Sequence, residues 1–190
     1  MRVKDNNKIN KIFESTLELN KSFGFSGLTM SKIAKHAGIA TGTLYIYFKD
    51  KVELINSLYI KLKKQKASEL LSVIKSDAPF KLNFKFLTQE FINKSLNNQN
   101  EVAFLEQYYR SPYLNTETIE YTTKLFKPID ELINKGKKDL IIKNYSKEML
   151  FCCISGIIKE YCTHVNNNII VHNDKNFNQL FKLIWDGIKE

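Results

Sequence analysis

The chain of 190 residues has few helix breakers, with only 7 Gly and 3 Pro. It has no apolar run that approaches the roughly 18 residues needed to span a bilayer. Its beginning, Met1 to Asn10, is polar and charged and carries no apolar stretch behind a basic one. We therefore expect no signal peptide and no membrane span, and we expect the protein in the cytoplasm.

Cysteine is also scarce, since Cys152, Cys153 and Cys162 are the only three in the chain. An odd number of cysteines in one apolar segment does not make a disulfide framework. We expect these thiols to be buried and structural. The alternative is that they sense oxidants or line a ligand pocket, but no basic neighbour is evident that would activate a thiol.

Signatures of catalysis are missing from the sequence. His36, His164 and His172 show no metal-ligand spacing with one another. No paired nucleophile and base, phosphate-binding loop or metal cluster is visible. We therefore expect a protein that is not an enzyme, with no catalytic residues, no metal site and no cofactor.

Acidic residues are few in the first third of the chain. Residues 1–66 hold 13 Lys and Arg against 5 Asp and Glu, whereas residues 67–190 hold 16 against 15. A basic lobe joined to a nearly neutral one is expected where only the first lobe meets phosphate groups. The alternative is a solvated, lysine-rich surface, and charge alone does not decide between the two.

Apolar residues recur at helical spacing along most of the chain, which predicts an all-α fold. We expect a three-helix head over 1–50 and a helical body over 51–190. Brief extended pieces at 139–144 or 168–172 remain open, because both stretches contain β-branched residues. The expected helices cover 8–23, 30–36, about 40–47, 51 toward 74, 80–97, 101–110, 115–136, 146–165 and 174–189.

A helix-turn-helix is predicted from Met30 to Phe48. Thr29 is a good N-cap for the first helix, and Ala34 is small enough for a second helix to cross it closely. Gly38 can adopt the positive φ that the turn between the two helices requires. Leu44 supplies the inward apolar side chain that locks the second helix. An ordinary helical hairpin remains the alternative to a DNA-binding motif.

Residues 11–59 resemble the DNA-binding domain of the TetR family of transcriptional regulators, most specifically in the run from Gly42 to Lys51, GTLYIYFKDK. The match departs from the usual pattern at two positions. Thr16 stands where the family usually has alanine, and Asn20 stands where it usually has an aromatic core residue. We expect Phe23 to fill the space left by Asn20.

The resemblance implies a set of DNA contacts at the start of the recognition helix, at the preceding helix and at the helix that follows. The methyl and hydroxyl of Thr43 suit thymine, and Gly42 permits close approach of the backbone. For Tyr45 and Tyr47 the alternative is packing against Phe48 and the first helix. The expected DNA-binding residues are Thr29, Ser31, Lys32, Thr41, Gly42, Thr43, Tyr45, Tyr47 and Lys51.

For the body, the resemblance implies a helical C-terminal domain that binds a small molecule and forms a homodimer through its last two helices. The alternative for the wide apolar stripe of the last helix is an intramolecular core. The expected interface residues are Gly156, Ile157, Phe177, Phe181, Ile184 and Trp185.

Aromatic residues gather over 80–126, and as a group they suit a small, largely apolar effector, although core packing is the simpler account of each one. The expected pocket residues are Phe84, Phe91, Phe104, Tyr108, Tyr109 and Phe126. The sequence and the resemblance together predict a ligand-responsive regulator that binds a palindromic double-stranded DNA operator as a dimer. The resemblance favours a repressor, and an activator is the alternative. An enzyme and a helical adaptor for other proteins are the rival hypotheses.

Overall fold

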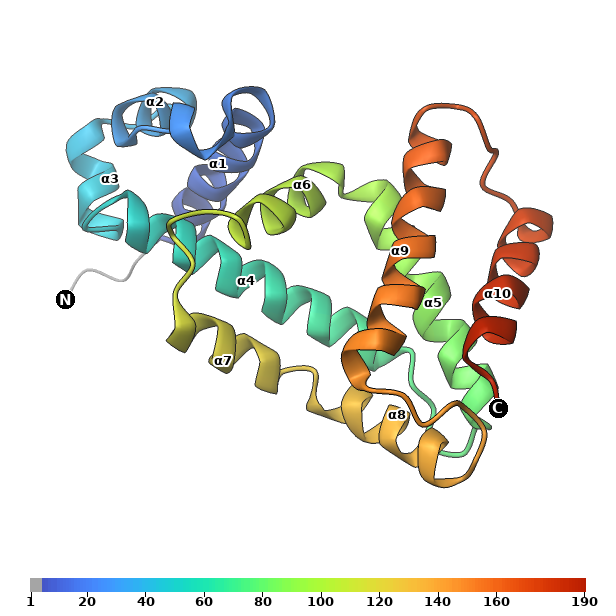
Figure 1. Cartoon of the computed structure of the whole chain (residues 1–190). Helices are drawn as coiled ribbons and strands as arrows, with labels where there is room; N and C mark the ends of the chain where they lie inside the picture. The colour runs from blue at the N-terminus through green and yellow to red at the C-terminus, as the bar shows by residue number, and fades with distance from the viewer. Residues whose placement is uncertain (1–4) are drawn as a thin grey trace. The chain divides into compact units, whose positions relative to one another are not determined.

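The computed structural model describes residues 5–190, and over that range the chain forms ten helices and no strand, which confirms the all-α expectation (Figure 1). The helices are α1 (Asn6–Gly27), α2 (Met30–His36), α3 (Thr41–Tyr47), α4 (Lys51–Ser72), α5 (Phe80–Asn97), α6 (Gln99–Tyr108), α7 (Thr116–Lys124), α8 (Lys127–Lys138), α9 (Lys147–Asn166) and α10 (Asp174–Ile188).

The chain divides into two compact units, which we call the head unit and the body unit. The head unit runs to Gln65 and takes up again over Asn98–Leu125, so it contains α6 and α7 as well as the N-terminal helices. The body unit consists of Lys66–Asn97 and Phe126–Glu190. The chain therefore passes from one compact unit to the other after Gln65, Asn97 and Leu125, and the domain boundary after residue 50 stays a prediction.

Local signals set the helix ends in the head unit. Asp5 caps α1, with its carboxylate accepting from the backbone N–H of Asn7 at 2.9 Å. Gly24 interrupts α1 with a φ of 61°, as expected of a glycine at that point. The carboxylate of Asp50 accepts from the backbone N–H of Glu53 at 2.8 Å, so Asp50 caps the first turn of α4.

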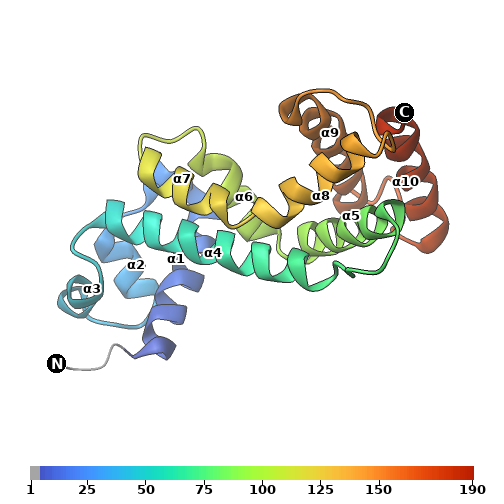
Figure 2. The ribbon, with the colours of Figure 1, turned by 90° about the horizontal axis from the view of Figure 1, so that it is seen from below.

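The head unit has its own core, in which aromatic rings join α6 to the N-terminal helices. Phe104 of α6 meets Phe25 edge to face, with ring centres 5.1 Å apart. Tyr108 stacks on Tyr59 of α4 at 3.9 Å. In the view from below, α7 lies along the first part of α4 (Figure 2). The largest fully buried side chains of this core are Ile12, Leu28, Ile33, Leu44, Leu54, Ile55, Leu58, Tyr59, Phe104 and Tyr108.

Asn20 is one of three polar residues that α1 buries, beside Ser15 and Thr16. Its side chain is fully buried, and among residues 5–190 neither its amide nitrogen nor its oxygen has a hydrogen-bond partner. The expectation that Phe23 fills this space is wrong, because Phe23 is 57% exposed. Phe23 precedes the Gly24 interruption and lies instead under the Lys32 ammonium, 5.5 Å from its ring centre.

In the body unit, α10 packs against α9 and α5 (Figure 1). Gly136 of α8 lies so close to Phe80 that a Cβ would stand 2.6 Å from the ring, and a larger residue would push the two helices apart. The core of this unit comprises Phe80, Phe84, Ile92, Ile142, Leu150, Ile158, Tyr161, Cys162, Phe177, Leu180, Phe181, Ile184, Trp185 and Ile188.

The helix expected over 115–136 is in fact two helices, α7 and α8, separated by Leu125 and Phe126. Pro128 explains the break, because it has no N–H to donate to the preceding turn and its ring disfavours helical backbone just before it. The extended pieces considered for 139–144 and 168–172 amount to one isolated antiparallel bridge, between Ile142 and Lys189.

Candidate nucleic-acid interface

The turn between α2 and α3 has the geometry that the sequence predicts. The hydroxyl of Thr29 accepts from the backbone N–H of Lys32 at 3.2 Å and caps α2. Gly38 has a φ of 67°, and the following N–H, of Ile39, returns to the carbonyl of Ala34 at 3.0 Å. Because this tight turn lets α3 follow α2 directly, the two helices form a helix-turn-helix.

The helix α3 is fixed by one side and presents the other to solvent. Leu44 is completely buried in the head core. At about 100° per residue, Gly42 and Ile46 lie on the side of α3 opposite Leu44. Gly42 is exposed, and a Cβ built on it would meet no atom within 4 Å. The outer side of α3 is therefore open along its length.

The remaining predicted residues of α3 flank this outer side. Tyr45 is 52% exposed, whereas Thr41, Thr43 and Tyr47 are partly buried. Tyr47 packs against the head core, as the alternative for the tyrosines suggested, while leaving part of its side chain accessible. The structure thus brings Thr41, Gly42, Thr43, Tyr45 and Tyr47 onto one short helix, with Gly42 and Tyr45 the most accessible of the five.

At the start of α2 the three predicted residues differ in what their side chains do. The Thr29 hydroxyl is engaged in the helix cap, and Ser31 is exposed. The Lys32 ammonium donates to the carbonyl of Gly27 at 3.2 Å and lies over the Phe23 ring. Lys32 is exposed, so its long side chain has access to solvent from this position.

Lys51 is held inside the head unit. Its ammonium donates to the carbonyls of Leu28 at 3.0 Å and Phe25 at 3.3 Å, and it lies 5.2 Å from the centre of the Tyr113 ring. These contacts secure the start of α4 against the end of α1. A contact of Lys51 with the DNA backbone, which the resemblance implies, stays a prediction.

Positive charge surrounds the motif locally. Between Leu28 and Lys49 the sequence has Lys32, Lys35 and Lys49 and no acidic residue. The excess is diluted in the compact unit, because the stretch 98–125 adds four glutamates against one arginine and one lysine. The basic character therefore belongs to the α2–α3 surface more than to the head unit as a whole.

Sequence reasoning missed Ile46 and Lys35. Ile46 is 72% exposed on the outer side of α3, and Lys35 is exposed on α2. A signal for Ile46 was present: it stands two residues from the inward Leu44, which places it about 200° away around the helix. Its aliphatic character concealed this, because an isoleucine is ordinarily assigned to a core.

The six aromatic residues predicted to line a pocket fall into different compact units. Phe104, Tyr108 and Tyr109 belong to the head unit, and Phe84, Phe91 and Phe126 belong to the body unit. Phe104 and Tyr108 are completely buried, and Phe84 is nearly so. Core packing therefore accounts for these three.

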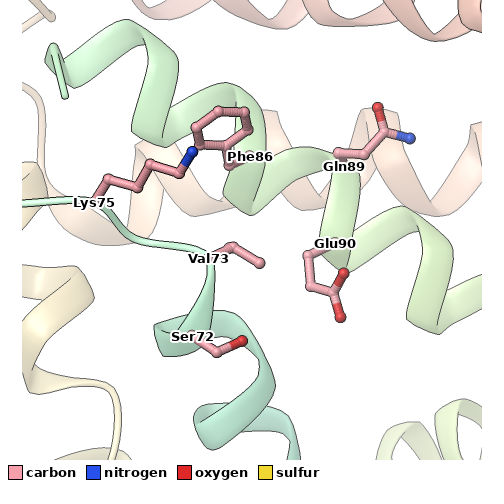
Figure 3. A pocket seen from close by; sticks show the side chains of 6 residues that line it. All are labelled: Ser72, Val73, Lys75, Phe86, Gln89 and Glu90. Carbon is pink, nitrogen blue, oxygen red and sulfur yellow. The ribbon is translucent and has the colours of Figure 1, made fainter.

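A hollow of about 340 Å³ opens on the body unit, between the end of α4 and the middle of α5 (Figure 3). None of the predicted pocket residues lines it. Asn83 shapes the nearby connection, with its side-chain amide bonding the backbone N–H and the carbonyl of Lys75, each at 2.8 Å. The lining consists of Ser72, Val73, Lys75, Phe86, Gln89 and Glu90.

Four of the predicted interface residues, Phe177, Phe181, Ile184 and Trp185, are buried in the body core, as the intramolecular alternative had it. Ile157 is partly buried and Gly156 is exposed, with no atom within 4 Å of a built Cβ.

A different set of uncharged side chains is exposed on the last two helices. We call this set the α9–α10 face; it consists of Met149, Cys152 and Gly156 on α9 with Leu183 and Gly187 on α10. Met149 and Leu183 are 63% and 66% exposed, although both are large apolar residues. This face, unlike the buried aromatic stripe, is accessible to a second molecule.

The three cysteines differ in environment. Cys162 is buried, and its burial raises the pKa of the thiol to about 11, so it stays protonated near neutral pH. Cys153 is partly buried, and Cys152 is exposed, which corrects the expectation that all three are buried.

Within residues 5–190, His, Cys, Asp and Glu form no group of three that could hold a metal ion. None of the helices described is long and apolar enough to cross a membrane.

Two family models together match most of the chain. Residues 12–58 match the model described as bacterial regulatory proteins, tetR family. Residues 79–189 match the model described as tetracyclin repressor-like, C-terminal domain. The first match covers the helix-turn-helix, and the second covers α5 to α10.

Relatives and solved structures agree with these matches. The chain is 27% identical to an HTH-type transcriptional regulator of Staphylococcus aureus over an alignment of 146 residues, and the match covers 72% of this chain and 76% of the relative. A TetR family transcription regulator from Marinobacter aquaeolei VT8 has the same fold, with a TM-score of 0.93 over 100% of both chains at 20% identity. The transcriptional regulator FadR from Bacillus subtilis, solved in complex with stearoyl-CoA, aligns with a TM-score of 0.72 at 23% identity, covering 94% of this chain and 98% of that one.

Proposed function

Because this chain belongs to the TetR family of bacterial regulatory proteins, and is thus a DNA-binding transcriptional regulator, we propose that it works as a ligand-responsive repressor. In this proposal a homodimer binds a palindromic operator with its two helix-turn-helix motifs. A small, largely apolar effector then releases the DNA. The proposal includes a regulatory rather than an enzymatic role and a location in the cytoplasm.

The outer side of α3 is the single observation that carries the proposal. Gly42 and Ile46 are accessible there, and the acid-free stretch from Leu28 to Lys49 surrounds them. An α-helix presented in this way fits the major groove, where its outward residues reach base edges. The lysines around it neutralise phosphates and make binding dependent on salt.

The proposed DNA contacts divide into two kinds. Thr41, Gly42, Thr43 and Tyr45 contact base edges or the phosphates beside them from α3. Tyr47, with the residues of the α2 start and of α4, contacts the backbone and sets the position of the protein on the duplex. The residues proposed for the backbone are Thr29, Ser31, Lys32, Tyr47 and Lys51.

Dimerisation is proposed to occur through the α9–α10 face. The two helices meet near its centre, since a Cβ on Gly187 would lie 3.5 Å from the sulfur of Cys153. Gly156 leaves room for a helix of the second copy, and Met149 and Leu183 supply apolar area. Two copies related by a twofold axis would form a four-helix interface from α9 and α10.

The effector is proposed to bind the body unit, and stearoyl-CoA is the first probe to use. The support is the shared fold with a regulator solved with that molecule. The hollow beside Phe86 offers apolar and polar groups together, including Gln89 and Glu90. An effector that binds the released form more tightly than the DNA-bound form would lower operator affinity by that difference.

An electrophoretic shift assay tests the DNA contacts. The operator is first selected from fragments of the source genome, and the variants Thr43→Ala and Tyr47→Phe are then compared with the unchanged protein. Both should weaken operator binding while leaving the dimer intact, and Lys175→Ala on the body unit should leave binding unchanged. Unchanged operator binding by both head variants would overturn the assignment.

Sedimentation equilibrium tests the interface. Gly156→Arg or Leu183→Glu should yield monomers, because each places a charge in the α9–α10 face. Lys175→Glu, on the charged side of α10, should remain dimeric. Monomeric behaviour of the unchanged protein at micromolar concentration would contradict the proposed assembly.

Release by the effector is tested on the same protein–operator complex. Stearoyl-CoA should dissociate the complex, whereas free coenzyme A should not. Release by neither compound would reject a long-chain acyl effector but leave operator binding standing.

A further inference from the structure

We infer that Ile46 is a specificity-determining residue that contacts the 5-methyl group of a thymine in each operator half-site. This inference rests on the proposed operator binding and adds to it the residue and the base chemistry. It starts from an apolar side chain that the folded chain leaves uncovered.

Ile46 is among the most exposed large apolar residues of the described chain. It is 72% exposed, and it is not among the residues that pack against the head core, although Tyr47 beside it is. Covering an aliphatic side chain contributes a favourable free energy in proportion to the apolar area that is removed from water. Ile46 therefore gains when another molecule covers it, and nothing in the described chain does so.

The position of Ile46 on α3 selects what can cover it. Gly42 lies one turn before it on the same outer side, and a Cβ there would meet no atom within 4 Å. The outer side of α3 thus has no side chain at one end and a single branched aliphatic group at the other. A partner with a flat or concave surface can therefore approach the backbone closely at Gly42 and contact the side chain of Ile46 one turn further along α3.

The surrounding charge indicates that the partner is a nucleic acid. The segment from Leu28 to Lys49 carries three lysines and no acidic residue. A surface that binds another protein ordinarily has an apolar centre and a polar rim of mixed charge. A surface that binds a DNA duplex has positive charge around the recognition helix. DNA is therefore the occupant to which the surface is suited.

Base chemistry narrows the contact further. In the major groove every base pair presents hydrogen-bonding groups, but only thymine adds an apolar group, its 5-methyl. The side chain of Ile46 has no hydrogen-bond donor or acceptor. A polar base edge covered by it would lose its hydrogen bonds to water and gain none from the protein, which costs free energy. A thymine methyl is the one natural groove feature whose contact with Ile46 removes apolar surface on both sides.

Deoxyuridine substitution tests this inference, because uracil differs from thymine only by the methyl group. Each thymine of the selected operator is replaced singly. One position in each half-site should weaken binding of the unchanged protein by about three- to tenfold. Ile46→Ala should bind the thymine and uracil operators equally, and Ile46→Val should retain most of the difference.

Thr43→Ser is the matched control, since it removes another methyl group of α3 and keeps the hydroxyl. It should leave the uracil effect at the Ile46 position intact. Loss of the effect in Thr43→Ser with its persistence in Ile46→Ala would overturn the inference and assign the methyl to Thr43. Operator binding without any uracil effect would overturn the inference alone, whereas no preference for any duplex would overturn the proposed function and this inference with it.

Discussion

The ammonium group of Lys51 lies 3.0 Å from the carbonyl oxygen of Leu28 and donates a hydrogen bond to it. The same group reaches the carbonyl of Phe25 and the face of Tyr113. One side chain at the start of α4 therefore joins the end of α1 to the connection that follows α6. This arrangement stabilises the platform on which α2 and α3 are held.

We predict that Lys51→Met lowers the free energy of unfolding by about 1–2 kcal/mol, because hydrogen bonds from a charged donor are lost while the aliphatic stem is kept. Urea denaturation measures the difference. Lys49→Met is the control, since Lys49 is exposed, and its effect should stay within about 0.5 kcal/mol. Equal stability of the two variants would contradict the structural role of Lys51.

The Lys51→Met variant also separates the structural role of Lys51 from phosphate binding. If Lys51 also neutralises a phosphate in the complex, Lys51→Met should reduce the slope of log affinity against log salt by about one. An unchanged slope with lower stability would leave Lys51 with the structural role alone.

The sequence predicted most of the elements because their ends are determined locally. Thr29, Gly38 and Asp50 act through hydrogen bonds or backbone angles within a few residues, so their effects follow from their neighbours in sequence. The break before α8 was missed although Pro128 was visible, because apolar periodicity continues on both sides of it.

Tertiary partners were much less predictable. An apolar stripe shows which side of a helix is buried but not what covers it. Phe181 and Trp185 were therefore predicted at an interface, whereas the fold places them in the core. The same limit applies to α6 and α7, whose packing with the N-terminal helices has no local signal. Ile46 was overlooked for the opposite reason, as an apolar residue that points outward.

We predict that Asn20→Leu raises the free energy of unfolding by about 1–3 kcal/mol, because it replaces a fully buried amide without hydrogen-bond partners by an apolar group of similar size. Thermal or urea denaturation measures the change.

Asn83→Leu is the matched control for Asn20→Leu. Asn83 is also buried, but its amide accepts from one backbone N–H and donates to two carbonyls, those of Lys75 and Ala78. The variant should therefore be less stable by about 2–4 kcal/mol. A loss of stability in both variants would show that the Asn20 amide is satisfied in solution.

Gly42→Ala should separate fold stability from DNA binding. Alanine is the better helix former, and its Cβ would enter open space, so stability should rise by a few tenths to about 1 kcal/mol. Operator affinity should fall, because the added methyl stands on the side proposed to enter the groove. Gly38→Ala is the contrasting variant, since its φ of 67° makes alanine destabilising there. Unchanged operator affinity in Gly42→Ala would show that the backbone does not approach the duplex closely at this point.

The stability of the body unit should fall in alkaline solution through Cys162. Burial raises the pKa of this thiol to about 11, which means that the folded state favours the protonated form. The contribution of a group with a raised pKa is present below its unfolded pKa and is lost as the pH rises toward the folded value. Urea unfolding at about pH 8 and about pH 10.5 should therefore show a loss of stability that is smaller in Cys162→Ala. The exposed Cys152→Ala variant should keep the full loss. If Cys162→Ala lost as much stability with pH as the unchanged protein, the thiol would not be the group responsible.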